Sequence, residues 1–354
     1  MKIGNLDIGK KLFLAPMAEV TDSSFRKICK ENGTGFTFTQ MVSALGVINN
    51  NFETLRLFSF SRSEKPIGVQ ILGNDPGIIG EAVKEISKMG PDLIDLNCGC
   101  PVEKVTANNF GSALLDNPKI IGKIVRSMVD SAFGIPVSIK IRLGKDRTHI
   151  NALEIAKEVE ENGGSLIFVH ARTRADKYDV APDWSWIKKV KDSISIPVVG
   201  NGSLFTPSDV KNMIETTGCD SAMIARGALG NPFLFSRFNQ LMETGVDPGA
   251  PDFSFVVETI LNQINNLELE FGEIIALDKA KKHTIWYFKN YSGVDSLLDK
   301  VFAIKDLNGL RMLIKEQAEK EPSKSYNGDD MEISKKFQKK VLFWLTDEPV
   351  KAFG

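Results

Sequence analysis

The sequence contains few cysteines for its length, with four among 354 residues. A disulfide-stapled scaffold needs many more, so that class of protein is excluded, and a reducing cytoplasm is the expected compartment. Cys98 and Cys100 form a Cys-x-Cys pair, but no second pair and no histidine cluster completes a set of four metal ligands. We therefore expect no metal.

Long hydrophobic runs and an excess of one charge are also missing. No apolar run reaches the roughly 18 residues that a membrane-spanning helix needs, and the N-terminus shows no pattern of a signal peptide. The net charge is −1, so bulk charge indicates neither a nucleic-acid nor a membrane partner. The composition, 42% hydrophobic and 25% charged, is that of an ordinary globular protein. We expect no membrane association and a monomer.

What the chain does contain is a regular alternation of short apolar runs and longer amphipathic segments up to about residue 240. Helical patterns fill many of the intervals, as at Pro76–Lys88, Lys119–Ala132, Ile150–Asn162 and Pro207–Glu215. Eight units of this kind predict an α/β fold, a (β/α)8 TIM barrel. The predicted strands are Leu12–Ala15, Phe36–Thr39, Ile67–Ile71, Leu93–Asn97, Val137–Ile141, Leu166–His170, Pro197–Gly200 and Ala222–Ala225.

An open, doubly wound sheet is the alternative fold. It usually carries a Gly-x-Gly-x-x-Gly phrase after its first strand, whereas this chain reads Ala15-Pro16-Met17-Ala18 there. The barrel is therefore the better interpretation.

The pattern of strands stops at a breaker-rich stretch, residues 243–251. We expect a barrel over residues 1–242, this linker, and a smaller C-terminal helical bundle over residues 252–354. The predicted helices are Phe253–Phe271, Ile274–Tyr291, with Gly272 near the break, and then about Ser296–Ile304, Leu307–Glu319 and Ile333–Leu345.

Polar side chains gather at the carboxyl ends of the predicted strands, which converge on the mouth of such a barrel. Cys100 follows the strand Leu93–Asn97 and is a candidate acid or nucleophile, with both roles open from its position alone. Lys140 interrupts the apolar run Val137–Ile141, which is costly unless the lysine is paired or binds an anion. Any single polar residue at a strand end usually only satisfies a loop, but this rim carries Gln70, Asn97, Cys100, Lys140, Arg142, His170, Arg172 and Asn201.

The last two strands end in glycine-rich turns, Gly200-Asn201-Gly202-Ser203 and Ala225-Arg226-Gly227. Barrels often bind phosphate at this place, through backbone N–H groups. Arg226 is suited to a bidentate contact with the same phosphate. Two tight turns without a ligand are the plainer explanation of each loop, but together they favour a phosphate-bearing ligand.

These phrases resemble, in order, those of the tRNA-dihydrouridine synthases, a family of FMN-dependent enzymes that reduce uridine in tRNA. The resemblance spans about residues 10–235 and is most specific at Asn97-Cys98-Gly99-Cys100-Pro101. The other matching phrases are Leu14–Ala18 with Thr21-Asp22 and Phe25-Arg26, then Val69–Gly73, Ile139–Gly144, Val169–Thr173, Gly200–Gly202, Ala225–Gly227 and, in the helical region, Lys281–His283 with Trp286-Tyr287.

The resemblance implies a tightly bound FMN. Pro16, Met17 and Ala18 would line the flavin through their backbone, and Gln70 would hydrogen-bond its edge. Lys140 would stabilise the reduced flavin, and His170 would contact the same ligand. The FMN phosphate would be held by Asn201, Gly202, Ser203, Ala225 and Arg226.

The resemblance also implies the reaction. Hydride would pass from reduced FMN to C6 of the uridine, FMN would be reduced again by NADPH, and Cys100 would give a proton to C5. An ordinary thiol is protonated at neutral pH, which suits an acid better than a nucleophile. Cys98 is assigned a packing role. The uracil would be contacted by Asn97, Arg142, Arg172 and Tyr178.

Contact with tRNA would have to come from a local basic patch. Residues 252–354 contain 15 lysines and arginines against 17 aspartates and glutamates. Lys282, His283, Trp286 and Lys289 share one side of a predicted helix, and we expect Lys282 and His283 to bind RNA. A second stripe, Lys335, Lys336, Lys339 and Lys340, is more typical of a solvated face.

Two other functions compete with this interpretation. A small-molecule FMN-dependent pyrimidine or dihydroorotate-type dehydrogenase would use similar barrel residues, but a free base needs no appended helical domain. A non-catalytic tRNA-binding protein would not need a proton donor beside Lys140 and His170. The resemblance leaves open which uridine is modified.

Overall fold

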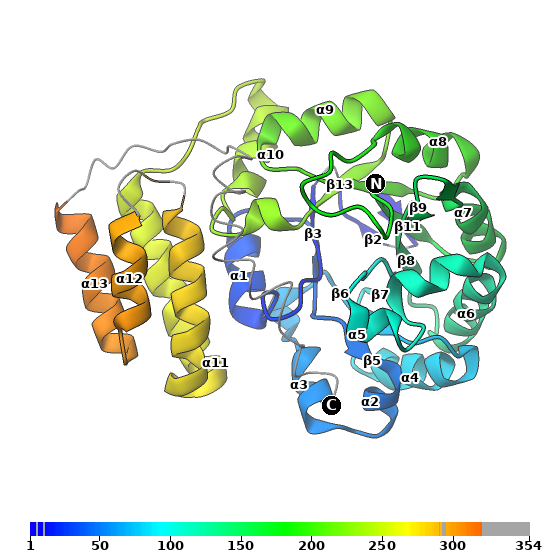
Figure 1. The fold of residues 1–354 in the computed structure, drawn as a ribbon, viewed down its shortest axis with the longest axis horizontal. Coiled ribbons are helices and arrows are strands. Elements are labelled where there is room, and N and C mark those ends of the chain that lie inside the picture. Colours follow the sequence, from blue (N-terminus) through cyan, green and yellow to red (C-terminus); the bar gives the residue numbers. More distant parts are fainter. Residues whose placement is uncertain (5, 10, 290, 292–294, 321–354) are drawn as a thin grey trace.

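The computed structural model describes residues 1–4, 6–9, 11–289, 291 and 295–320, and its centre is a parallel β-barrel (Figure 1). The strands follow one another around the barrel in the order β3-β13-β12-β11-β8-β7-β6-β4. A parallel bridge between Phe13 and Phe36 joins the two ends. The eight strands are β3 (Phe13–Leu14), β4 (Thr37–Phe38), β6 (Ile67–Leu72), β7 (Leu93–Cys98), β8 (Val137–Arg142), β11 (Leu166–His170), β12 (Val198–Asn201) and β13 (Ser221–Ile224).

Helices surround the barrel on its outside, as a barrel of parallel strands requires (Figure 1). Each of the eight predicted strands is present to within two residues at either end, so the predicted (β/α)8 fold is confirmed. The helices of this part are α1 (Ser23–Glu31), α2 (Ala44–Ile48), α3 (Phe52–Leu57), α4 (Pro76–Lys88), α5 (Glu103–Thr106), α6 (Pro118–Ser131), α7 (Ala152–Glu161), α8 (Ser185–Ser193), α9 (Pro207–Thr217) and α10 (Leu234–Thr244).

Several short elements were not predicted. Strand β5 (Val42–Ser43) adds to β6, β1 (Lys2–Ile3) pairs with β2 (Leu6–Asp7), and β9 (Gly144–Asp146) pairs with β10 (His149–Ile150). The connections between the barrel strands also contain three segments of 3-10 helix: Arg62–Glu64, Gly111–Asp116 and Arg226–Ala228.

Aromatic side chains fill the amino-terminal end of the barrel interior. Phe13, Phe38 and Phe168 are fully buried and meet at ring-centroid distances of 5.2 and 5.5 Å. Gly68 leaves room for them, because a Cβ there would lie 2.4 Å from the Phe38 ring. This buried cluster fills that end of the interior with apolar side chains.

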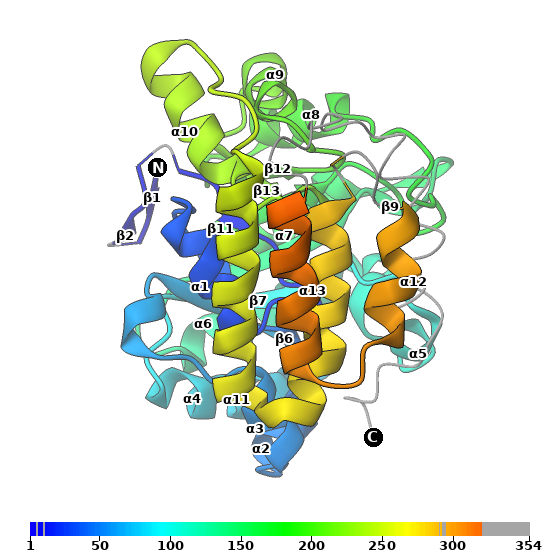
Figure 2. The ribbon, with the colours of Figure 1, turned by 90° about the vertical axis from the view of Figure 1, so that its left-hand side faces the viewer.

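Three helices pack beside the barrel: α11 (Phe253–Phe288), α12 (Asp295–Ala303) and α13 (Leu307–Lys320). Gly272 has φ 72° and ψ 167°, so α11 consists of two helical halves that reverse direction there (Figure 2). The sequence predicted two helices with a break near Gly272, and that break is confirmed. The Tyr287 hydroxyl donates to the side chain of Gln263 and ties the halves together at 2.9 Å. The first half packs on α1, where the Ser24 hydroxyl donates to the Gln263 carbonyl at 3.1 Å.

The predicted helix Ile333–Leu345, with its lysine stripe, lies outside the described residues. The division into a barrel over 1–242 and a helical domain from 252 stays a prediction. Within the described residues, no helix combines the length and apolar character that crossing a membrane requires.

Candidate active site

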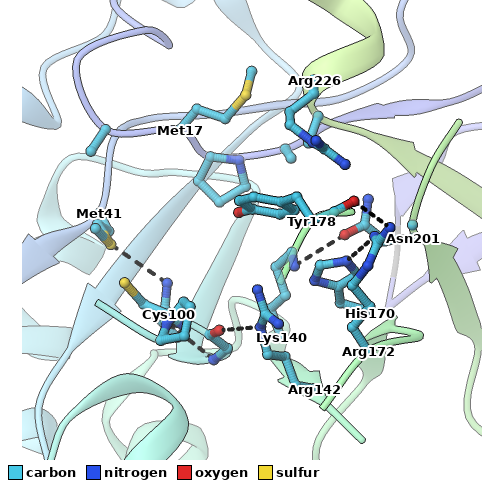
Figure 3. Close-up of a pocket in the computed structure, with 18 of the residues that line it drawn as sticks. Met17, Met41, Cys100, Lys140, Arg142, His170, Arg172, Tyr178, Asn201 and Arg226 are labelled. Carbon is cyan, nitrogen blue, oxygen red and sulfur yellow. Dashed lines mark hydrogen bonds between the residues drawn. The ribbon is translucent and has the colours of Figure 1, made fainter. Parts of the chain in front are cut away.

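A pocket opens at the carboxyl ends of the barrel strands (Figure 3). The residues that line it come from the carboxyl-terminal parts of β3, β6, β7, β8, β11, β12 and β13 and the loops after them, with Met41 from the segment between β4 and β5. All of the barrel residues singled out from the sequence line this pocket: Pro16, Met17, Ala18, Gln70, Asn97, Cys100, Lys140, Arg142, His170, Arg172, Tyr178, Asn201, Gly202, Ser203, Ala225 and Arg226. Their assignments to flavin, phosphate or uracil stay predictions.

Cys100 lies on the loop after β7, on one side of the pocket, with Lys140 between it and His170 (Figure 3). The Asn97 side chain shapes this loop, because its Oδ1 accepts from the backbone N–H groups of Gly99 at 3.1 Å and Cys100 at 2.9 Å. Burial raises the pKa of the Cys100 thiol above its ordinary value. The thiol is therefore protonated at neutral pH and able to give a proton.

Cys98, two residues earlier, points away from the pocket. Side chains alternate along a strand, so Cys98 faces the layer between the barrel and its helices while Asn97 faces inward. Cys98 is fully buried in the hydrophobic core, and burial raises its pKa well above the ordinary value. Its packing role agrees with the sequence interpretation.

Lys140 stands in the middle of the pocket (Figure 3). Its Nζ donates to Oδ1 of Asn201 at 3.3 Å, and the Asn201 amide group in turn donates to the Met223 carbonyl at 2.7 Å. Burial, aided by the charge of Arg142, lowers the pKa of Lys140 to about 8. An anionic group bound beside it would favour its charged form.

His170 is neutral in this setting. Burial and the surrounding arginine and lysine charges hold its pKa well below the ordinary value. Arg172 places a guanidinium nitrogen 3.2 Å from His170 Nε2. Because a guanidinium only donates, Nε2 accepts and the ring proton sits on Nδ1.

Arg142 and Arg172 are both nearly fully buried, at 2% and 1% exposure, and both hold loops. Arg142 donates to the Gly99 carbonyl at 3.0 Å and to the Thr173 carbonyl at 2.7 Å, which fixes the base of the Cys100 loop. Arg172 donates to the carbonyls of Tyr178 and Val180 and to the Ser203 hydroxyl. Both arginines were predicted as uracil contacts. That role stays a prediction, and the structure shows both of them holding loops.

The opposite end of the pocket suits an anion. Buried Nη1 of Arg226 has no hydrogen-bond partner, and its guanidinium lies 4.1 Å from the ring centre of Tyr178. The turns beside it are tight: a Cβ on Gly227 would lie 1.9 Å from the Leu204 carbonyl oxygen, and Gly202 has φ +136°. An orphaned buried guanidinium next to glycine turns fits a phosphate group.

The charge of the pocket points the same way. Four cationic side chains line it, Lys140, Arg142, Arg172 and Arg226, and no carboxylate is present among its described lining residues. A flavin mononucleotide has the matching features, a phosphate for the Arg226 end and a ring edge with hydrogen-bond acceptors for Lys140. The residues present therefore fit this cofactor.

His283 and Lys282 do not belong to the pocket. His283 is 2% exposed and packs between Phe25 of α1 and Trp286, at ring distances of 5.3 and 5.0 Å. Trp286 is equally buried, so the predicted stripe along α11 is not a continuous surface patch. The expectation that His283 lies on an RNA-binding surface is corrected by this packing. Lys282 is partly buried, and burial lowers its pKa.

Sequence reasoning gave no role to Asp95, Ser138 and Met41. Asp95 interrupts the apolar run of β7 as Lys140 interrupts that of β8, so the same argument applied to both would have found it. Ser138 binds the Asp95 carboxylate, and Met41 lines the pocket near Asn97 (Figure 3). Nothing in the sequence around Met41 indicates this position.

Within the described ranges, no group of three or more His, Cys, Asp or Glu side chains is arranged to hold a metal ion.

The fold and the pocket define a (β/α)8 barrel enzyme with its site at the carboxyl ends of the strands. The chain belongs to the dihydrouridine synthase (Dus) family, whose profile matches residues 13–322. It is thus an oxidoreductase by family.

Curated relatives are similar over most of their length. A probable tRNA-dihydrouridine synthase of Rickettsia conorii is 33% identical over 313 residues, which cover 86% of this chain and 94% of the relative. The tRNA-dihydrouridine synthase B of Pseudomonas aeruginosa is 36% identical over 294 residues, 83% of this chain and 88% of the relative.

Among solved structures, morphinone reductase in complex with tetrahydroNAD superposes with a TM-score of 0.50 at 10% identity, over 72% of this chain and 92% of that one. At that identity the likeness concerns the barrel fold alone.

Proposed function

We propose that this protein is an FMN-dependent tRNA-dihydrouridine synthase that reduces the C5–C6 double bond of specific uridines in tRNA. One observation carries the proposal most directly: in a barrel of the dihydrouridine synthase family, a protonated thiol, Cys100, faces a cationic pocket that fits a flavin phosphate. The names of the curated relatives support tRNA as the substrate.

Residues of the inner pocket would hold the cofactor. Arg226, Asn201, Gly202, Ser203 and Ala225 would bind its phosphate end, while Pro16, Met17 and Ala18 line the ring, all being pocket residues. Gln70, Lys140 and His170 would contact the ring edge. When bound, FMN supplies hydride to C6 of the uracil and is reduced again by NADPH.

Lys140 would place its positive charge beside the ring edge and stabilise an anionic form of the cofactor. Burial and the charge of Arg142 lower the pKa of Lys140 to about 8, although the nearby Asp95 charge acts to raise it. A bound anion would raise that pKa and keep the lysine charged through neutral pH.

Cys100 would donate the proton that C5 of the uracil requires. A thiol with a raised pKa keeps its proton until it is needed and is a poor nucleophile, so the acid role is favoured over covalent attack. Asn97 and Arg142 hold the thiol loop and would contact the uracil. Arg172 and Tyr178 would complete the substrate wall.

The target uridine would have to leave the folded RNA to reach this recessed thiol. Helices α11–α13 stand beside the barrel and would orient the tRNA, with Lys282 in contact with RNA. A tRNA substrate and NADPH as reductant place the reaction in the cytoplasm. A small-molecule pyrimidine or dihydroorotate-type dehydrogenase is the alternative, because the pocket alone admits a free pyrimidine.

The experiment that tests the function is dihydrouridine mapping in tRNA from cells that lack this protein. Loss of dihydrouridine at defined positions, restored by the wild-type gene, is expected. Unchanged tRNA would refute the proposal. Purified protein should also be yellow, release FMN on denaturation, and reduce tRNA far faster than free uridine or orotate; the opposite preference would favour the small-molecule alternative.

A further inference from the structure

A carboxylate lies beneath the pocket and is not used by the proposed reaction. Asp95 of β7 is 1% exposed and does not line the pocket. Its Oδ1 accepts from the Ser138 hydroxyl at 2.6 Å, and its Oδ2 accepts from Gln70 Nε2 at 2.7 Å. Burial raises the pKa of Asp95 to about 6, so the group is ionised at neutral pH at a cost in free energy.

The hydrogen bonds above Asp95 all run in one direction. Gln70 gives Nε2 to Asp95 and therefore presents Oε1 to Asn97, whose Nδ2 donates to it at 2.7 Å. Asn97 in turn presents Oδ1 to the N–H groups of Gly99 and Cys100. An amide is nearly symmetric in shape, so only its partners decide which end is the donor.

The carboxylate is the group that sets this direction. An ionised carboxylate accepts and never donates, so Gln70 must turn its NH₂ toward it. If Gln70 turned over, Asn97 would have to turn as well, and its NH₂ would then face the two loop N–H groups. Two donors facing each other cannot hold the loop.

We infer that Asp95 is a positioning residue that fixes the orientation of the Gln70 and Asn97 amides and thereby the backbone of the loop that carries Cys100. The inference rests on the proposed function, because it assumes that Cys100 is the proton donor and that Gln70 meets the flavin. Asp95 acts through its neighbours and touches neither cofactor nor substrate.

The test is a double-substitution cycle of Asp95→Asn and Ser138→Ala. With Asp95→Asn alone, the new NH₂ can face Ser138, whose hydroxyl can rotate to accept it, so Gln70 keeps its direction. With Ser138→Ala alone, the carboxylate still accepts from Gln70. In the double variant the new NH₂ has no acceptor unless it turns to Gln70, which reverses both amides.

The first readout is hydrogen exchange of the flavin-free protein. The single variants should keep the protection of the Gly99 and Cys100 amides, and the double variant should lose it about tenfold or more while the amides of Ile94 and Leu96 stay protected. Equal protection of these amides in all four proteins would overturn the inference. So would a loss in the double variant that is no larger than the sum of small losses in the two single variants.

The second readout is single-turnover reduction of tRNA by the FMN-loaded proteins. The double variant should lose ten- to a hundredfold in rate, with KM for tRNA unchanged and a larger solvent deuterium isotope effect, because proton transfer from Cys100 becomes slower. A higher KM for tRNA together with a lower melting temperature, without an isotope effect, would indicate general damage and contradict the inference.

The two readouts separate the inference from the function on which it rests. If wild-type protein fails to reduce tRNA while the exchange results hold, the proposed function fails and the positioning role stands. If wild type reduces tRNA but the protection losses of the two single variants simply add up in the double variant, the positioning role fails and the proposed function stands. Should the double variant not fold, Asp95→Leu, which removes both acceptors and keeps the branching of the side chain, is measured in the same two ways.

Discussion

At the scale of single residues, substitutions of Cys100 and Cys98 are expected to have opposite effects on the reaction rate, although the two residues are only two positions apart. Cys100→Ala removes the proposed proton donor and should lower the rate of dihydrouridine formation by a factor of about 100 or more, with FMN binding unchanged. Rates measured on tRNA transcripts, with flavin absorbance for cofactor content, check this.

Cys98→Ala is the matched control. Cys98 is fully buried away from the pocket, so its replacement should cost about 1 kcal/mol of stability and leave the rate close to wild type. A wild-type rate in Cys100→Ala, or equal losses in both variants, would contradict the assignment of the acid.

Lys140 predicts how cofactor binding depends on pH. Its pKa, lowered to about 8, means that the free protein carries the charge below pH 8 and loses it above. FMN affinity should therefore be highest below pH 8 and fall as the pH rises through it.

The Lys140 prediction is checked by titrating flavin-free protein with FMN between pH 6 and 10. Lys140→Arg keeps its charge over this range and should flatten the pH dependence, whereas Lys140→Met should bind FMN more weakly below pH 8 and approach the wild-type affinity as the pH rises above it. A wild-type affinity that stays constant up to pH 9 would be incompatible with this role of Lys140.

At the scale of elements, the turn of 3-10 helix Gly111–Asp116 supports the thiol loop. Gly111 has φ +60°, and a Cβ on it would lie 2.7 Å from the Cys100 carbonyl oxygen. Gly111→Ala should therefore displace Cys100 and lower the reduction rate at least tenfold, besides costing about 1–3 kcal/mol of stability.

Gly90→Ala is the control for Gly111→Ala. Gly90 has a similar φ of +67° but nothing within 4 Å of the added Cβ, so the backbone strain is matched without the clash. It should lose stability and keep its rate. Equal rates in the two variants would show that the turn does not position Cys100.

The elements also show what the sequence predicts well and what it does not. Strands such as β6 and β7 are buried on both faces and therefore appear as apolar runs that can be recognised directly. Strand β5 has only two residues and gives no such run. The surroundings of His283 depend on the reversal of α11 at Gly272, which brings the second half of the helix against α1. Periodicity along one helix cannot predict which side is covered.

The candidate site follows a similar rule. Lys140 and Cys100 could be predicted because a charge or thiol is unusual at the end of an apolar strand. The loop-holding bonds of Arg142 could not, because its carbonyl partners come from segments far away in the sequence. Those of Arg172 depend on how the loop after β11 folds back on it. Asp95 was equally visible in the sequence and is understood only through the contacts of Gln70 and Ser138.

At the scale of the whole molecule, the helices beside the barrel are expected to add affinity for RNA and to leave the chemistry unaffected. Lys282→Ala should raise KM for tRNA, by a factor of about 3 to 10, and reduce the dependence of KM on salt, because a phosphate contact is lost. The maximal rate and FMN binding should not change, since Lys282 lies outside the pocket.

Lys84→Ala is the control for this contact. Lys84 is an exposed lysine of α4 that pairs with Glu81 on the same helix. Its removal should leave KM unchanged. If Lys282→Ala and Lys84→Ala raise KM alike, the effect comes from the change in net charge. If neither raises KM, the prediction that Lys282 contacts RNA is wrong.

The central claim joins a reduced flavin, a tRNA uridine and the Cys100 thiol in one reaction, and a single turnover tests all three. Wild-type protein loaded with FMN and reduced without oxygen is mixed with unmodified tRNA while flavin absorbance is followed, and the dihydrouridine formed is then counted. The account predicts one dihydrouridine for each flavin reoxidised, and much slower reoxidation in Cys100→Ala. Flavin that stays reduced with wild-type protein, or reoxidises without forming dihydrouridine, would contradict it.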